Sequence, residues 1–195
     1  MPDMSEQPDV SPIPTNLKQI SQSLRLTGWI AFWTQLVLGV ISSVILLLYA
    51  FSSNTSNRGT EVAQGTSFGI FFAISGLVTL GMSIYWAFRY TRLSKQLTDP
   101  IANLRPSKID TIKAVRIGII VNLTGMLLTL VGAQAIIGST LARSLSQQPG
   151  TFVPGGTVQF IQPLDLFVVQ ANTNTIFAHF VGVVAALWLL TRLYK

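Results

Sequence analysis

The stretch that decides the fold is Ile117–Ala142, IGIIVNLTGMLLTLVGAQAIIGSTLA, which contains no charged side chain. A helix rises about 1.5 Å per residue, so about 20 apolar residues cross the hydrocarbon core of a bilayer. Three further runs, Trp29–Phe51, Thr66–Phe88 and Leu166–Thr191, are also free of charge and also long enough. Each of the four runs therefore predicts a membrane-spanning helix.

The composition leaves little room for anything besides these spans. The chain has 195 residues, of which 49% are hydrophobic and 10% are charged, whereas a soluble domain usually carries about 25% charged residues. We therefore predict an all-α polytopic membrane protein, a bundle of four transmembrane helices in a single domain over 16–195. Residues 1–15 are rich in proline and are expected to form a disordered arm. The spans are expected at about 27–51, 66–90, 115–142 and 166–191.

The basic residues are distributed unevenly between the two sides of the expected spans. Eleven of the thirteen Lys and Arg fall in the arm, the loop 89–116 and the tail, and two, Arg58 and Arg143, fall in the other loops. Because basic residues collect on the cytoplasmic side, we predict that both termini and the loop 89–116 face the cytoplasm. The lipid bilayer, and not nucleic acid, is the partner this charge favours; a specific anionic partner is the alternative interpretation.

Several functional classes find no support in the sequence. The absence of cysteine excludes disulfides and thiolate metal sites. No catalytic residue and no catalytic motif such as G-x-S-x-G or H-E-x-x-H is found, so we do not expect an enzyme. The first apolar run is longer than the apolar core of a signal peptide, so we expect that no signal peptide is cleaved. The N-terminal arm carries acidic residues and few Arg, so we expect no transit peptide.

Three helix ends can be predicted from local signals. The tetrad Ser107–Asp110 is a capping box that would open the third helix before it enters lipid. Pro163, followed by Asp165, is typical of the first turn of a helix, here the fourth. The segment from Asn16 to Arg25 has helical spacing of its apolar residues, and it predicts either a short interfacial helix or an N-terminal extension of the first span.

Small residues recur in the spans at helical spacing. Gly118, Gly125 and Gly132 lie seven residues apart in the third span, and Ala178 and Gly182 belong to a similar stripe in the fourth. Small residues let membrane helices approach closely, and a seven-residue repeat favours a left-handed bundle. We predict close packing of the third span on the fourth, and we leave the pairing of the other helices open.

Uncharged polar side chains inside the spans are the candidate functional residues. Each amide in hydrocarbon needs a hydrogen-bond partner. Two interpretations stay open: these residues hold the helices together, or they line a path for an ion or a small solute. The candidates are Gln35, Asn122, Gln134, Gln170, Asn172, Asn174 and His179.

The direction of the spans predicts which candidates meet. The third span rises from the cytoplasm and the fourth returns to it. Gln134 should therefore lie at the outer level, near the amides in 170–174. Asn122 and Gln35 should both lie in the inner half.

His179 is a weak candidate metal ligand. It is the single histidine of the chain, and no Asp or Glu lies inside a span. A hydrogen-bonded core histidine is the plainer interpretation. One copy of the chain would make a poor metal site, so we expect a homo-oligomer or other membrane subunits as partners. The sequence identifies no cofactor.

Four segments carry a resemblance to a known family. They are Gly28–Val37 (GWIAFWTQLV), Tyr90–Leu97 (YTRLSKQL), Arg116–Met126 (RIGIIVNLTGM) and Leu164–Gly182 (LDLFVVQANTNTIFAHFVG). Together they resemble the chloroplast inner-envelope permease-in-chloroplasts family, which is also described as a component of the Tic translocon, and its cyanobacterial relatives. The resemblance runs from about Leu17 to the end of the chain.

The resemblance implies a four-span membrane permease, or a permease-associated protein, linked to iron homeostasis, with iron as the transported species. It equally implies the alternative of a non-transporting scaffold or subunit of a protein-translocation or assembly machinery. The family's recurring polar positions coincide with Gln35, Asn122, Gln170, Asn174 and His179. Because no transit peptide is visible, the resemblance favours a bacterial member in the plasma (inner) membrane or the thylakoid membrane.

Overall fold

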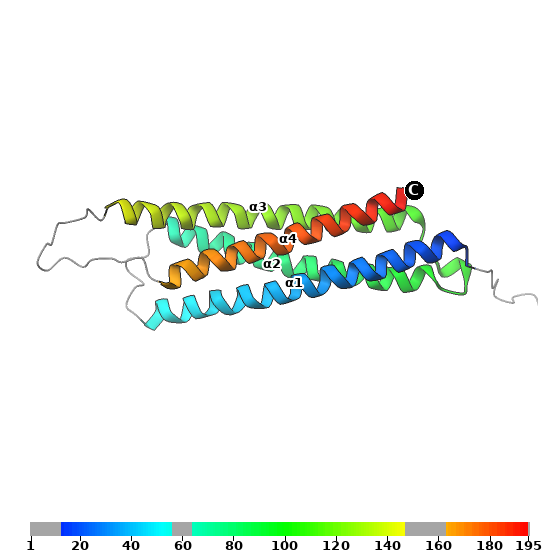
Figure 1. Ribbon diagram of the computed structural model, residues 1–195, viewed down its shortest axis with the longest axis horizontal. Coiled ribbons are helices and arrows are strands. Elements are labelled where there is room, and N and C mark those ends of the chain that lie inside the picture. Colours follow the sequence, from blue (N-terminus) through cyan, green and yellow to red (C-terminus); the bar gives the residue numbers. More distant parts are fainter. Residues whose placement is uncertain (1–12, 56–63, 147–162, 195) are drawn as a thin grey trace, which may run out of the picture.

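The structure is a computed structural model, which describes residues 13–55, 64–146 and 163–194. The regular elements in these ranges are helical, as predicted (Figure 1). Most of the arm 1–15 lies outside the described residues, so its disorder stays a prediction. The elements are α1 (Thr15–Thr55), α2 (Gln64–Leu97), the short 3-10 helix η2 (Ala102–Leu104), α3 (Lys108–Ser146) and α4 (Pro163–Tyr194).

Each of the four α-helices is long and apolar enough to cross a membrane, so the protein is a multi-pass membrane protein. All four helices are longer than the spans expected from the sequence, and the largest additions are the start of α1 at Thr15, the end of α2 at Leu97 and the start of α3 at Lys108. The segment before the first span is thus an extension of α1 and not a separate interfacial helix. These extra turns project from the basic end of the bundle.

The four helices form a ring in which each packs on its neighbours in chain order. α1 contacts α2, α2 contacts α3, α3 contacts α4, and α4 closes the ring on α1; α2 and α4 also touch across the diagonal. The predicted packing of the third span on the fourth is confirmed. Figure 1 shows the start of α1, the end of α4 and the α2–α3 connection at the same end of the bundle. That this end faces the cytoplasm remains a prediction from the charge distribution.

Every helix faces the bundle axis with a seven-residue repeat. Buried positions recur at alternating spacings of four and three residues, which is the pattern of left-handed coiled-coil packing. In hydrocarbon such a face needs small or shape-matched side chains, because lipid supplies no hydrophobic drive for helix association. In α4 the buried positions of this repeat are Val168, Asn172, Thr175, His179, Gly182, Ala186, Leu189 and Leu193.

The helix starts follow the local signals in the sequence. Ser107 caps α3: its Oγ accepts a hydrogen bond from the Asp110 backbone N–H at 3.1 Å and donates to the Asp110 carboxylate at 2.6 Å. α4 begins at Pro163, as predicted.

The cap on α3 yields a stability prediction. We expect Ser107→Ala to lower the free energy of unfolding by about 1 kcal/mol, because the first turn of α3 loses the acceptor for one of its free N–H groups. Ser107→Thr keeps the hydroxyl and should stay within about 0.5 kcal/mol of the native protein. Reversible unfolding in mixed detergent micelles measures both. Equal losses in the two variants would contradict the cap.

The basic end of the bundle has a hydrophobic core. Leu24, Tyr90, Val115 and Leu189 belong to a buried cluster to which all four helices contribute. Ser21 of α1 and Ser94 of α2 tie their helices together, since each hydroxyl bonds the other residue's carbonyl at 2.9 Å. The bundle therefore stays packed up to its basic end.

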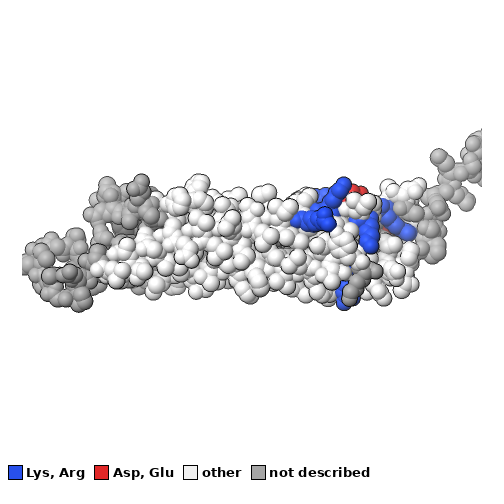
Figure 2. Space-filling view, turned by 90° about the horizontal axis from the view of Figure 1, so that it is seen from above, with Lys and Arg blue, Asp and Glu red and all other residues white. Residues whose placement is uncertain are grey.

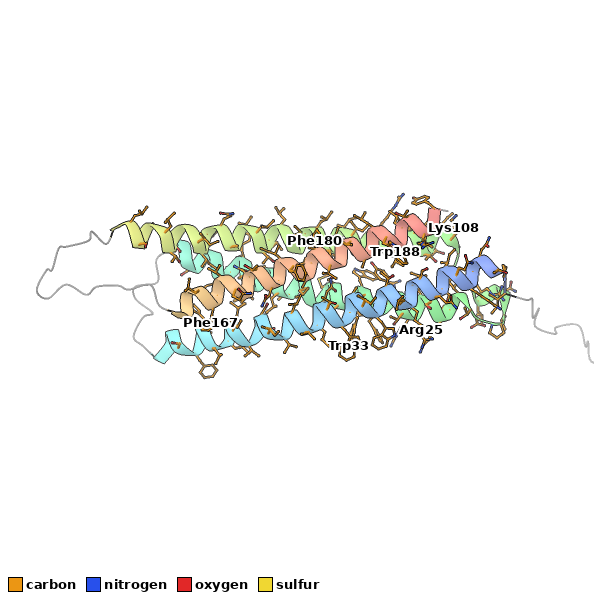
Figure 3. All side chains as sticks on the ribbon, viewed as in Figure 1. Arg25, Trp33, Lys108, Phe167, Phe180 and Trp188 are labelled. Atoms are coloured by element: carbon orange, nitrogen blue, oxygen red, sulfur yellow. The ribbon has the colours of Figure 1, made fainter. Side chains whose placement is uncertain are left out.

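Cationic and aromatic side chains mark the same end of the bundle. Figure 2 shows the Lys and Arg side chains of this view gathered there, and Figure 3 places Arg25, Trp33 and Trp188 in that half, with Phe167 at the opposite end. Arg89 lies 4.5 Å from the Trp86 ring and Arg192 lies 5.1 Å from the Trp188 ring. Trp and cationic side chains concentrate where hydrocarbon meets headgroups, so this girdle marks one membrane interface. The tryptophans of the chain are Trp29, Trp33, Trp86 and Trp188.

Candidate functional site

One polar side chain from each helix meets at a single level of the bundle axis. These four residues, named here the central cluster, are Gln35 of α1, Ser83 of α2, Asn122 of α3 and His179 of α4, and each is at most 3% exposed. All four occupy buried positions of the seven-residue repeats, so the packing of the helices brings their side chains together. Gln35 and Asn122, which the sequence placed in the same half of the membrane, are in direct contact.

Hydrogen bonds join the four helices through the cluster. The Gln35 Nε2 donates to Ser83 Oγ at 2.9 Å, to Asn122 Oδ1 at 3.0 Å and to the Ala178 carbonyl at 3.1 Å. Ser83 Oγ lies 2.6 Å from Asn122 Oδ1. The Asn122 Nδ2 donates to the Gly118 carbonyl at 2.8 Å, which fixes the orientation of the Asn122 amide with its oxygen toward the cluster. Asn122 Oδ1 is the hub that accepts from its neighbours.

His179 faces two acceptor oxygens. Its Nδ1 lies 3.3 Å from Asn122 Oδ1, and its Nε2 lies 3.2 Å from the Gly76 carbonyl. A neutral imidazole carries one N–H, so the tautomer decides which of these two contacts is the hydrogen bond. This is the bonded core histidine that was the plainer interpretation. Within the described ranges, no three or more His, Cys, Asp or Glu residues come together as a metal site.

Glycines make the room that the cluster occupies. A Cβ on Gly125 would collide with the His179 ring, and a Cβ on Gly182 would collide with the amides of Gln35 and Asn122. The sequence predicted helix-packing roles for these glycines and for Ala178, which is buried and whose carbonyl accepts from Gln35. The small residues of α3 and α4 therefore leave room for the polar side chains of the cluster as well as for a neighbouring helix.

Gly132 permits the close helix approach that was predicted for the stripe, but with α2 and not with α4. A Cβ on Gly132 would lie 2.9 Å from the Gly69 carbonyl oxygen, and a Cβ on Gly69 would lie 3.0 Å from the Gly132 carbonyl oxygen. α2 and α3 therefore approach backbone to backbone at this level, which only glycine permits.

Comparison with known proteins decides the family. The model of a family described as "Protein of unknown function (DUF3611)" matches residues 14–194. The chain belongs to the DUF3611 family. It is also 35% identical over 180 residues to "Protein TIC 21, chloroplastic" of Arabidopsis thaliana, an alignment that covers 89% of this chain and 57% of that protein. The chain thus spans a little over half the length of this relative. No solved structure matches it.

The remaining candidates of this DUF3611 chain lie outside the central cluster. Gln134 is exposed on α3. Gln170 is also exposed, and its Nε2 donates to Asn174 Oδ1 at 3.0 Å, one turn along α4. Asn172 is buried, with its Nδ2 unpartnered among the described residues. In the part of the chain that the structure describes, Gln134 forms no hydrogen bond with the amides in 170–174, so the expected meeting is not seen there.

Sequence reasoning did not assign Ser83 or Tyr90 to the site of this DUF3611 protein. Ser83 joins the cluster directly, and the Tyr90 hydroxyl is a buried group without a partner in the described residues. The available signal was the spacing Gly76, Ser83, Tyr90, three positions seven residues apart on the axis-facing side of α2. Hydroxyl groups are common on membrane helices, so the spacing, and not the residue type, carried the information.

Proposed function

We propose that this protein is a membrane permease, or a permease-associated protein, that serves iron homeostasis from the plasma (inner) or thylakoid membrane. The observation that supports this is the central cluster, in which each helix contributes one polar side chain to the bundle axis. Apolar repeats alone would pack four helices in lipid. Polar side chains that face a bundle interior are typical of solute pathways.

The chemistry of the cluster limits what it can hold. It offers an imidazole nitrogen and amide oxygens, and a borderline cation such as Fe(II) accepts both donor types. The four side chains include no carboxylate, so nothing in the cluster compensates a divalent charge. We therefore propose that a second copy of the chain or another membrane subunit completes the site for a passing ion.

A second candidate function is a non-transporting scaffold in a protein-translocation or assembly complex. The favouring observation is that Gln35, Ser83 and Asn122 bond one another and close the axis at their level. Such a cluster would fix the register of the helices and present a rigid outer surface to other subunits. The chloroplast relative named TIC 21 is compatible with either function.

Transport into liposomes separates the two functions. We expect purified protein in vesicles to give Fe(II) entry above protein-free vesicles, and we expect His179→Ala to lower it about tenfold or more, because the ion loses its nitrogen donor. Flux is measured with an internal iron-sensitive dye and normalised to folded protein. Ser75→Ala is the control, since the Ser75 hydroxyl bonds the Phe71 carbonyl of its own helix.

The scaffold function predicts the opposite result in the same experiment. No entry above protein-free vesicles, together with stable co-purification of other membrane subunits, would contradict the permease and support the scaffold.

A further inference from the structure

Polar side chains continue along the bundle axis on both sides of the central cluster. Tyr90 lies seven residues after Ser83 on α2, toward the basic end, and Asn172 lies seven residues before His179 on α4, toward the other end. Seven residues correspond to about 10 Å of helix. Tyr90 is 3% exposed and Asn172 is 2% exposed. The axis therefore carries polar groups at three successive levels.

Each flanking residue has a buried polar atom without a partner. Tyr90 Oη and Asn172 Nδ2 find no hydrogen-bond partner among the described residues. Buried polar atoms in native proteins are nearly always bonded to protein or to an ordered water, and the requirement is stricter in hydrocarbon. Two such atoms on one axis, one on each side of a bonded cluster, therefore need an occupant.

The surroundings of Tyr90 connect it to the central cluster. Its hydroxyl lies against Gly118, where any side chain would collide with it. The carbonyl of the same glycine accepts the hydrogen bond from Asn122 Nδ2 at 2.8 Å. A phenol can both donate and accept, so a small polar molecule at Tyr90 Oη would have a defined partner one turn from the cluster.

The surroundings of Asn172 are polar as well. The carbonyl of the preceding residue, Ala171, accepts from Ser42 Oγ of α1 and from Thr175 Oγ1, each at 2.9 Å. Hydroxyl groups of two helices thus lie within one turn of the free Nδ2 group. A polar site with several donors and acceptors is the kind that holds a buried water.

We propose that Tyr90 Oη and Asn172 Nδ2 each bind a water molecule, and that these two waters and the central cluster form one polar path along the bundle axis. The central cluster is the closed point of that path, and the two water positions lie on its two sides. The groups that line it are hydroxyls, amides and one imidazole, so a permeating ion would keep part of its own hydration. The role as a path rests on the proposed function, whereas the binding of water does not.

Water binding is tested first, without any transport. In the protein labelled with ¹⁵N and with ¹³C in its tyrosine rings, in lipid nanodiscs, we expect magnetisation transfer from water to the Asn172 side-chain amide and to the ring protons beside the Tyr90 hydroxyl at short mixing times. The Asn122 side-chain amide serves as the internal reference, because its Nδ2 is bonded to the Gly118 carbonyl, and its transfer should be weaker. Absence of transfer at both Tyr90 and Asn172 would overturn the proposal.

Two isosteric variants test the path. Tyr90→Phe and Asn172→Leu delete the atoms that would bind water and nearly keep the shape of each side chain, so both variants should remain folded. We expect a loss of Fe(II) entry of about tenfold in these folded variants. Matched controls are Tyr85→Phe and Thr173→Val, because both side chains are exposed on the same two helices. Unchanged entry in both isosteric variants would refute the path.

The two experiments separate this proposal from the proposed function. Water transfer at both residues with no iron entry in the native protein would leave the two water sites standing and would refute the permease. Iron entry without water transfer would refute the two water sites and would leave the permease standing.

Discussion

Gly182→Ala is expected to lower the free energy of unfolding by about 2–4 kcal/mol, the combined cost of overpacking and of buried hydrogen bonds that must break. The added methyl group would fall on the amides of Gln35 and Asn122, which are both buried and cannot move toward solvent. The collision therefore separates side chains from two different helices. Unfolding in mixed detergent micelles gives the value, and the crosslinking pattern of the helices reports whether the bundle still assembles.

The control for this substitution is present in the same chain. A Cβ on Gly81 or Gly138 would meet nothing within 4 Å in the described structure. Gly81→Ala and Gly138→Ala should therefore leave stability unchanged or raise it by up to about 1 kcal/mol, since alanine favours the helix over glycine. A similar loss at all three glycines would show that the collision with the polar cluster does not decide the effect.

Asn122→Leu should have an effect of comparable size, a loss of about 2–4 kcal/mol. The reason is that Asn122 Oδ1 accepts from Gln35 and contacts Ser83 and His179, so its removal leaves several buried polar atoms without their acceptor. A single interhelical hydrogen bond in a membrane protein averages about 0.6 kcal/mol. A loss well above that value would show that the cluster acts as a unit.

Asn174→Leu is the matched control for this loss. Asn174 accepts from Gln170 on the exposed side of α4, and the same substitution there should cost no more than about 0.6 kcal/mol. A folded Asn122→Leu protein with native stability and lost iron entry would contradict the structural role and favour the conducting one. Measuring stability and entry on the same preparation makes the two outcomes distinct.

The fold was predictable because charge and length decide it. Lipid excludes charged side chains, so the four uncharged runs, such as Ile117–Ala142, specified four helices with no further information. The starts of α3 and α4, which Ser107 and Pro163 mark, were predictable for a local reason, since a helix start is set by a few neighbouring residues. The sequence did not decide where α1 begins. An interfacial helix and an N-terminal extension of the first span would show the same helical spacing of apolar residues.

The site was predictable in part. Gln35, Asn122 and His179 stood out because an amide or imidazole in hydrocarbon demands a partner. The sequence could not exclude Gln134 and Gln170, which lie on exposed faces of the bundle. Which face of a helix turns inward depends on the rotation of all four helices together, and this is fixed by glycines such as Gly125 and Gly182 that act across chain distances of more than fifty residues.

The girdle of tryptophan and arginine has a consequence for how the molecule responds to its membrane. It pins one end of the bundle to one leaflet, with Arg89 on Trp86 and Arg192 on Trp188, whereas no tryptophan lies near the far end. In a thinner or thicker bilayer, the hydrophobic mismatch is then absorbed at the far leaflet by tilt or local lipid adjustment. The depth of His179 below the anchored surface then stays constant, and the change in thickness falls on the other side of the central cluster.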